Sequence, residues 1–340
     1  MNKTTATNLL GIGVGLVIGL AVVTIGYVVI KGNPNRPTRD ISKKFVYNID
    51  PYLKVDPKLI AWRQVLQIPT GMKTPRGIAA DAKGDIAVVG DSAVRLFSPE
   101  GKLLGGFTLT FHPTCAAFGP GGLLYIASRR FILATDTAGD KRTRWQDLGD
   151  RAVLTSLAAA GDDVYAADAG NKLVWHFDTD GKLLGKFAQK DRNKEADGLV
   201  VPSAHLDVVT YPDGLIRVTD PGRHRIEAYT RTGYCELKWG FFSAANVAGF
   251  PGCCNPTDLA VLPNGEFVTS EKGIPRVKVY AADGKFRNVV AAPKDFAPDT
   301  VGLDLATDPA GRVLVLDPVR KAVRIFVRKT AGPTTRKDQP

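Results

Sequence analysis

The longest apolar stretch of the chain lies close to its N-terminus. Residues 9–30, LLGIGVGLVIGLAVVTIGYVVI, form a run of 22 positions without a charge. As a helix, at about 1.5 Å per residue, this run would be roughly 33 Å long, close to the hydrocarbon thickness of a bilayer. A cleaved signal peptide is the alternative, but its apolar region is usually about 7–15 residues long and ends in a small-x-small site. The pattern therefore predicts an uncleaved transmembrane helix over 9–30, behind a tail over 1–8.

Small residues repeat along one side of this predicted helix. Gly11, Gly15 and Gly19 are spaced four residues apart, which places them on one helical face. Such a stripe lets a second helix approach closely within a membrane, although glycine is also common in such helices for no packing reason. We expect residues 9–30 to contact membrane lipid and to pack through these glycines against another helix.

The flanking charges leave two membrane orientations open. Lys3 precedes the apolar run, whereas five cations follow it within residues 31–44. A strict positive-inside rule places the C-terminal part in the cytoplasm, but large domains cross a membrane largely regardless of charge. A short tail ahead of an apolar run is also the usual layout of a signal anchor that exports the domain behind it. We favour the periplasmic or other extracytoplasmic side, with the cytoplasm as the alternative.

Beyond residue 58 the pattern changes to short apolar segments that repeat six times. Each unit contains up to four short strands, separated by turns rich in glycine and aspartate. The units begin at Pro75, Pro113, Leu154, His205, Pro256 and Val301. Their equivalent turn residues Gly84, Gly122, Asp162, Gly214, Gly265 and Gly311 are 38, 40, 52, 51 and 46 residues apart by subtraction. A period of about 40–50 residues with four strands is typical of a β-propeller.

The sixth unit stops after three strands, near Arg328. The segment AWRQVLQIP, residues 61–69, precedes the first complete unit and matches the fourth-strand position of the others. Pairing it with the end of the chain would close the ring and remove two free sheet edges. We therefore predict an all-β, six-bladed propeller over 59–328, with a linker over 31–58 and a flexible tail over 329–340.

Composition agrees with many short strands, since the chain holds 35 glycines and 22 prolines. The formal net charge is +11 and the pI about 9.4. Such a charge can favour nucleic acid, anionic lipid or an acidic protein. No helix-turn-helix pattern and no basic motif with stacking aromatics is present, so we expect no nucleic-acid partner. Membrane or periplasmic proteins remain the expected partners.

The repeat unit resembles a known family. The pattern P-x-G-I-A-x-D, a G-x-I-x-V-x-D-like strand, an R-I-x-V-F-like strand and a D-G-K turn is similar to NHL repeats across residues 61–328. DAGNKLVWHFDTDGKLLGKF (168–187) and DPGRHRIEAYTRTG (220–233) match best. The second unit departs most, with Arg129 where the others carry an acid. We expect the acids at this position, Asp168, Asp220, Glu271 and Asp317, to accept hydrogen bonds from turn amides.

Candidate chemistry gathers in the loops that lead into the innermost strands. In propellers these loops surround one mouth of the central channel, where ligands and partners usually bind. Two of the four histidines and three of the four cysteines fall there. The expected rim residues are Arg76, His112, Cys115, Asp207, Asp258 and Asp304.

A metal site can be drawn from His205, Cys253 and Cys254, because blades four and five are neighbours. Imidazole and thiolates suit zinc or copper. The alternatives are that the cysteine pair only shapes a loop, that it forms a strained vicinal disulfide, or that Cys235 bonds one of the two. Cys115 packs as a small apolar residue unless the channel is narrow enough for it to join.

Two families of similar propellers imply further ligands. Peptidylglycine amidating lyases hold zinc through channel histidines, and His112 and His205 occupy comparable positions. Blade six offers no third histidine, which weakens that resemblance. Calcium-dependent lactonases bind the ion through channel acids and amides. Asp207, Asp258 and Asp304 stand at equivalent positions in successive blades, so they could hold a cation or could equally cap turns between blades.

No G-x-S-x-G elbow and no complete catalytic set is found. The preferred interpretation is a non-catalytic, membrane-anchored scaffold that docks partners on the propeller rim, as an accessory subunit of a larger membrane-associated complex. A metal-dependent lyase or hydrolase acting in the channel is the first alternative. A redox-linked role for Cys253 and Cys254 is the second.

Overall fold

The structure is a computed structural model that describes residues 48–298 and 300–330. The chain divides into two compact units, residues 1–49 and 50–340, and the description below concerns the second. The predicted transmembrane helix over 9–30, with Gly11, Gly15 and Gly19, lies outside the described residues. Within them, no helix is long and apolar enough to cross a membrane.

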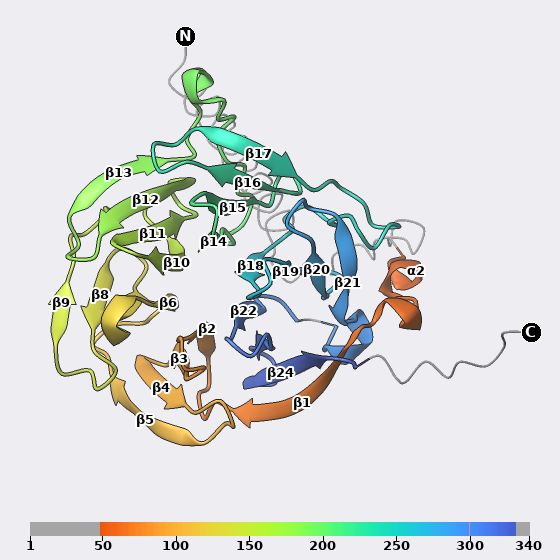
Figure 1. The fold of residues 1–340 in the computed structure, drawn as a ribbon, viewed down its shortest axis with the longest axis horizontal. Helices are drawn as coiled ribbons and strands as arrows, with labels where there is room; N and C mark the ends of the chain where they lie inside the picture. Colours follow the sequence, from red (N-terminus) through yellow and green to blue (C-terminus); the bar gives the residue numbers. More distant parts are fainter. Residues whose placement is uncertain (1–47, 299, 331–340) are drawn as a thin grey trace, which may run out of the picture. The chain divides into compact units, whose positions relative to one another are not determined.

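Six four-stranded antiparallel sheets surround a central channel and form a six-bladed propeller, as the repeat predicts (Figure 1). Within blades 1–5 the strands follow each other in chain order from the channel to the outer edge. The first three blades are β2 (Pro75–Ala80), β3 (Ile86–Gly90), β4 (Ala93–Phe97) and β5 (Leu103–Thr108); β6 (Cys115–Phe118), β7 (Leu124–Ala127), β8 (Ile132–Thr135) and β9 (Arg142–Arg144); and β10 (Leu154–Ala160), β11 (Asp163–Asp168), β12 (Leu173–Asp178) and β13 (Leu183–Phe187).

The remaining blades follow the same plan, except that the last one takes its outer strand from the start of the domain. They are β14 (Val208–Thr210), β15 (Ile216–Asp220), β16 (Arg225–Tyr229) and β17 (Cys235–Trp239); β18 (Asp258–Val261), β19 (Phe267–Ser270), β20 (Val277–Tyr280) and β21 (Phe286–Ala291); and β22 (Asp304–Thr307), β23 (Val313–Asp317), β24 (Ala322–Arg328) and β1 (Trp62–Pro69). Within residues 48–298 and 300–330, helix is confined to single turns: α2 (Asp50–Leu53), η2 (Pro57–Leu59), η3 (Pro120–Gly122), η4 (Arg192–Lys194) and η5 (Pro293–Asp295).

The predicted closure of the ring by residues 61–69 is confirmed. Strand β1 pairs antiparallel with β24, from Trp62 opposite Arg328 to Pro69 opposite Ala322. The Trp62 indole is 2 % exposed, and its N–H donates to Asn288 Oδ1 in blade 5 at 2.8 Å. The closing strand therefore also ties the last blade to its neighbour.

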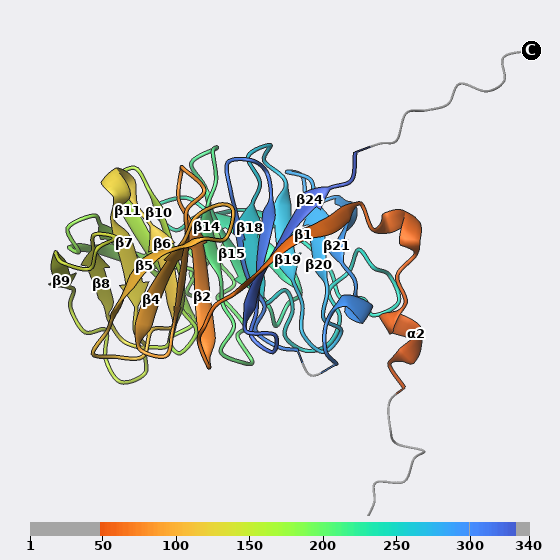
Figure 2. The ribbon, with the colours of Figure 1, turned by 90° about the horizontal axis from the view of Figure 1, so that it is seen from below.

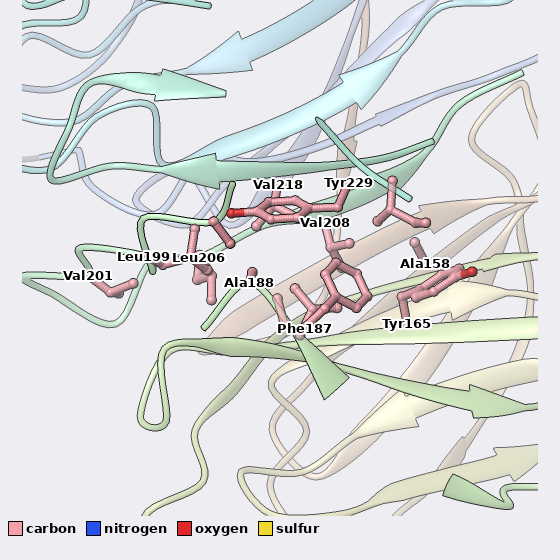
Figure 3. Close-up of a cluster of buried hydrophobic side chains, with 14 of the residues drawn as sticks. Ala158, Tyr165, Phe187, Ala188, Leu199, Val201, Leu206, Val208, Val218 and Tyr229 are labelled. Atoms are coloured by element: carbon pink, nitrogen blue, oxygen red, sulfur yellow. The ribbon is translucent and has the colours of Figure 1, made fainter. Parts of the chain in front are cut away.

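Each blade packs its apolar face against the next blade. Between blades 3 and 4 the contact is aromatic, with Phe187 lying between Tyr165 and Tyr229 (Figure 3). The ring centroids are 6.1 Å apart for Tyr165 and Phe187, and 5.5 Å for Phe187 and Tyr229. A single blade cannot cover both faces of its sheet, so this packing makes stability a property of the ring.

The D-G-K turns have a packing role that the repeat alone does not reveal. Gly181 has φ +90°, and a Cβ added there would lie 2.4 Å from the Trp145 ring of blade 2. Gly284 repeats the arrangement against Trp239 of blade 4, at 2.6 Å and φ +79°. Glycine is required at both turns because an aromatic ring of the preceding blade occupies the space of a side chain.

The expected role of the acids at the end of the second strands, as acceptors from turn amides, is confirmed for Asp168 and Asp317. Asp168 Oδ1 accepts hydrogen bonds from the N–H groups of Val153, Gly170 and Asn171 at 2.9–3.0 Å. Asp317 accepts from the turn amides of Val319 and Arg320, whereas Asp220 accepts from Val200 N–H in the connection ahead of β14. Glu271 differs, because its carboxylate pairs with buried cations, Arg276 at 2.6 Å and Lys278 at 2.8 Å.

In blade 2, where Arg129 replaces the acid, the preceding serine takes over part of this role. Ser128 Oγ accepts from the N–H groups of Arg130 and Phe131, both at 3.1 Å. A hydroxyl can therefore hold this turn without a carboxylate.

Candidate functional site: the channel and its mouth

The innermost strands line a channel cavity of about 270 Å³. Its wall is built from short side chains, among them Ala79, Ala116 and Ala158, together with Cys115 and three aspartates. Small residues are needed because six strands converge on the axis. The aspartates are therefore the main charged groups facing this space.

These aspartates form a ladder between successive blades. Asp207 accepts a hydrogen bond from the Leu259 N–H on β18, and also from Val208 N–H at 2.8 Å. Asp258 accepts from Leu305 N–H on β22 at 2.9 Å. In turn, Asp304 accepts from Ile78 N–H on β2 at 2.7 Å. These hydrogen bonds are not the turn caps considered from the sequence, because the donors are amides of the innermost strand of the next blade.

Neutral residues occupy the same position in the other three blades. Ser156 Oγ accepts from Val208 N–H at 3.3 Å and so continues the ladder in blade 3. Gly77 lies so close to blade 2 that a Cβ would fall 2.8 Å from the Cys115 Cα. One half of the ring is therefore acidic, and the other half is neutral and tightly packed.

Burial raises the pKa of all three carboxyl groups. The pKa of Asp207 rises to about 7, with repulsion from Asp304 adding to the effect, and that of Asp304 rises to about 6. Asp258 is buried and lies between the charges of Asp207 and Asp304, and its pKa is raised well above the usual range. At neutral pH the acidic half of the ring therefore retains part of its protons.

A second cavity of about 370 Å³ forms one mouth of the channel, and all six blades contribute to its wall. Four of the expected residues line it: Arg76, His205, Asp258 and Asp304. The lining also includes Thr74, Thr114, Thr155 and Thr257. Sequence reasoning missed these hydroxyl groups, although a threonine within one residue of the start of the innermost strand recurs in four units.

The two candidate histidines have different surroundings. Burial and the positive charge of Lys272 lower the pKa of His205 to about 4, so its imidazole is neutral at physiological pH. His112 is exposed, and its Nδ1 lies 3.0 Å from Ser92 Oγ. It lines neither cavity, so the structure does not bring the two histidines together in one pocket.

Cys115 and Cys235 are buried thiols away from the other cysteines. Burial raises the pKa of both, and the charges of Asp304 and Asp207 add to the effect at Cys115. All four cysteines are free. The Sγ atoms of Cys253 and Cys254 lie 2.9 Å apart.

Among the residues that the structure describes, no group of three or more His, Cys, Asp or Glu side chains has the geometry to hold a metal ion. The zinc or copper site at His205, Cys253 and Cys254 and a cation at the three aspartates remain predictions.

The turns within the blades differ in charge between the two faces of the disc. Seen from the side, strands cross the thickness of the disc, so its turns gather on two opposite faces (Figure 2). The six turns between second and third strands, on the side of the mouth, carry eight Lys and Arg residues against two acids, Asp91 and Glu271. The opposite turns, between first and second and between third and fourth strands, carry seven Lys and Arg residues against eleven acids.

We call the cations around the mouth the basic collar: Arg76, Arg129, Arg130, Lys172, Arg223, Lys272, Arg320 and Lys321. Arg223 pairs with Asp220 at 2.8 Å, and Arg130 with Asp147 at 2.9 Å. Arg76, Lys172 and Lys321 are exposed and make no ion pair with any described residue. Their charge is thus available to a partner.

Comparison with known proteins finds solved structures that share the fold of this chain. A protein of unknown function from Bacteroides thetaiotaomicron has a TM-score of 0.57 at 18% identity, over 76% of this chain and 70% of that one. A streptogramin B lyase has a TM-score of 0.55 at 10% identity, over 79% and 97%. Virginiamycin B lyase from Staphylococcus aureus has a TM-score of 0.55 at 9% identity, over 79% and 100%.

A further structure, of an inactive variant of that lyase with quinupristin, has a TM-score of 0.55 at 10% identity over 79% and 99%. At these identities the likeness shows the six-bladed fold alone. No protein-family profile and no curated protein matches the chain. The resemblance to NHL repeats therefore stays a prediction.

Proposed function

We propose that this protein is a membrane-tethered docking module whose basic collar binds an acidic segment of a partner protein. The observation that carries the proposal is the unpaired positive charge around a mouth to which all six blades contribute. Complementary charge at such a surface speeds association and selects partners. Residues 9–30 would supply the tether and place the propeller on the extracytoplasmic side. Resistance of the full chain to alkaline extraction tests the tether.

The docking proposal is tested with matched charge reversals. Lys172→Glu combined with Lys321→Glu reverses two free charges of the basic collar. Lys102→Glu combined with Lys182→Glu reverses two exposed lysines in turns of the opposite face. The full-length proteins are purified from their native membrane in mild detergent, and partners are quantified by mass spectrometry.

We expect the collar variant to recover at least about tenfold less of its stoichiometric partner than the native chain does. The control variant should recover an amount within about twofold of the native one. Recovery of the partner should also fall with rising salt, because exposed charges are screened. Equal recovery with both variants, or no stoichiometric partner for the native chain, would overturn the proposal.

A second candidate function is an elimination or hydrolysis at the channel mouth. His205, neutral at physiological pH, and Asp304, with a pKa of about 6, line the same cavity. Such a pair offers a base and an acid in one site. Three of the similar structures are lyases, and one of them contains quinupristin, which makes turnover of quinupristin the first assay. Activity that is lost in His205→Ala and kept in His112→Ala would support this function, and no turnover by the native chain would count against it.

A further inference from the structure

The pair Cys253 and Cys254 lies in the long connection between β17 and β18, and docking on the basic collar gives it no role. Cys253 is exposed and Cys254 is 3 % exposed. The two Sγ atoms lie 2.9 Å apart. Solvent therefore reaches the Cys253 thiol, and the Cys254 thiol lies directly behind it.

The connection holds these thiols in a defined place. Asn255 Nδ2 donates to the carbonyl groups of Pro251 and Lys272, at 2.7 Å and 2.9 Å. Its Oδ1 accepts from Lys272 N–H at 2.9 Å. The cysteine pair is thereby fixed against the turn between β19 and β20, which carries Lys272.

Polar groups of two connections surround the inner sulfur. Burial alone would raise the pKa of the Cys254 thiol, but hydrogen bonds from Cys253 and Ser203 and the charge of Lys272 lower it below its ordinary value. Lys272 Nζ also donates to Ser203 Oγ at 2.7 Å, which orients both groups. The hydrogen bond to Cys254 raises the pKa of Cys253, so the outer thiol donates its proton toward the inner sulfur.

We propose that Cys253 and Cys254 form a reactive dithiol that is oxidised by small disulfides and closes into a vicinal disulfide. In the first step the Cys253 thiol passes its proton to the Cys254 sulfur and attacks one sulfur of the external disulfide, whose S–S bond breaks. A mixed disulfide forms on Cys253, and the leaving thiolate takes the proton from Cys254 and departs as a thiol, which leaves Cys254 as a thiolate. In the second step the Cys254 thiolate attacks the Cys253 sulfur and expels the other external thiolate. The protein loses two electrons and two protons, and the external disulfide gains both.

The order of the two steps follows from exposure and charge. Only Cys253 offers solvent a sulfur that a bulky disulfide can approach, whereas the stabilised thiolate at Cys254 is placed to resolve the intermediate. Adjacent Cα atoms are about 3.8 Å apart, closer than the roughly 4.4–6.8 Å that disulfides prefer. The closed form should therefore be readily reduced again by a dithiol.

Glutathione disulfide is the probe, added to the full-length protein in mild detergent. Trypsin releases residues 239–272, a peptide that holds Cys253 and Cys254 and neither of the other cysteines. We expect this peptide to lose two hydrogens and resist alkylation, and dithiothreitol to restore both thiols. Two alkylated thiols after exposure to the probe, or a link to Cys235, would overturn the proposal.

Serine variants test the order of attack. Cys254→Ser should accumulate the glutathione adduct on Cys253. Cys253→Ser should form the adduct on Cys254 at least about tenfold more slowly, because that sulfur is covered. Equal rates in both variants would overturn the assigned order.

The role of Lys272 is tested by the rate of disulfide closure, which would not change if the lysine were merely structural. Lys272→Gln should slow closure about tenfold at neutral pH and should lose less of its rate at higher pH, where the thiolate forms without help. Lys182→Gln, at an exposed lysine in a turn of the opposite face, is the matched control and should close at the native rate. An unchanged rate in Lys272→Gln would remove the lysine from the proposal.

Discussion

Asp207, Asp258 and Asp304 hold their protons more tightly in the folded chain than in the unfolded one. An unfolded aspartate releases its proton near pH 3.8, whereas Asp304 and Asp207 release theirs at about 6 and 7. Between these values the folded chain binds more protons, so a rise in pH favours unfolding. We expect the free energy of unfolding to fall by about 6 kcal/mol between pH 4 and pH 8 from Asp207 and Asp304 together, at about 1.4 kcal/mol per pKa unit.

Replacing the middle residue should remove its own contribution to this pH dependence. In Asp258→Asn the amide oxygen can still accept from Leu305 N–H, and the amide N–H can donate to Asp304, to which Asp258 is hydrogen-bonded. We expect about 1–2 kcal/mol of added stability at pH 8 and a flatter profile. Urea denaturation followed by tryptophan fluorescence measures this, since Trp62, Trp145, Trp175 and Trp239 all lie in the propeller. An unchanged profile, matching that of the exposed-turn control Asp283→Asn, would contradict the assignment.

Single residues could be predicted only where the repeat aligns them. Asp207, Asp258 and Asp304 were found because each follows the same turn in its blade. The surroundings of Cys254 could not be found, since Ser203 and Lys272 come from different connections. The coupling of Asp304 to Ile78 likewise joins residues that are 226 positions apart and meet only when the ring closes.

Among the elements, the turn glycine packed on the aromatic ring of the preceding blade gives a sharp test. In Gly181→Ala the alanine has to adopt a positive φ, and its Cβ also has to fit against the Trp145 ring. Gly311→Ala has a similar φ of +72° but no atom within 4 Å of the added Cβ. We expect losses of about 3 kcal/mol and about 1 kcal/mol in the free energy of unfolding. Equal losses in urea denaturation would show that φ alone matters.

The strands themselves were largely predictable, because six repeats of alternating apolar residues specify both the blades and their order. The long connections were not. Residues 188–207 and 240–257 interrupt the period without strands of their own, and they carry the thiol pair and most of its neighbours. Irregular backbone follows no periodicity, so the sequence pattern contains little information about where such segments pack.

For the whole molecule, ring closure should dominate stability. Trp62→Ala removes a buried indole and its hydrogen bond to Asn288, at the point where β1 joins blades 5 and 6. We expect a loss of about 3–5 kcal/mol in the free energy of unfolding. Val65→Ala, at an exposed position of the same strand, should cost less than about 0.5 kcal/mol. A similar small loss for both would mean that the ring does not depend on its closing strand.

The distribution of charge is also a property of the whole molecule. A net charge of +11 indicates only that an acidic or anionic partner is favoured. The fold places each turn on one of two faces. Once the turns are assigned to their faces, those around the mouth show an excess of cations and those on the opposite face an excess of acids. Because faces depend on strand direction, this polarity could have been derived from the repeat once the blades were assigned.

The pairing of β1 with β24 also decides how the disc responds to mechanical load. Any tension transmitted through the chain ahead of Ile60 reaches the propeller where Ile60 and Ala61 bond to Val289 of blade 5, and then passes to the closing strand. The register runs from Trp62 opposite Arg328 to Pro69 opposite Ala322, so the loaded end of β1 is the end at which β24 finishes. Pull directed along β1 would strain the whole ladder together, whereas pull directed outward would break its hydrogen bonds one after another. The direction of the force, more than its size, would then determine whether the ring opens.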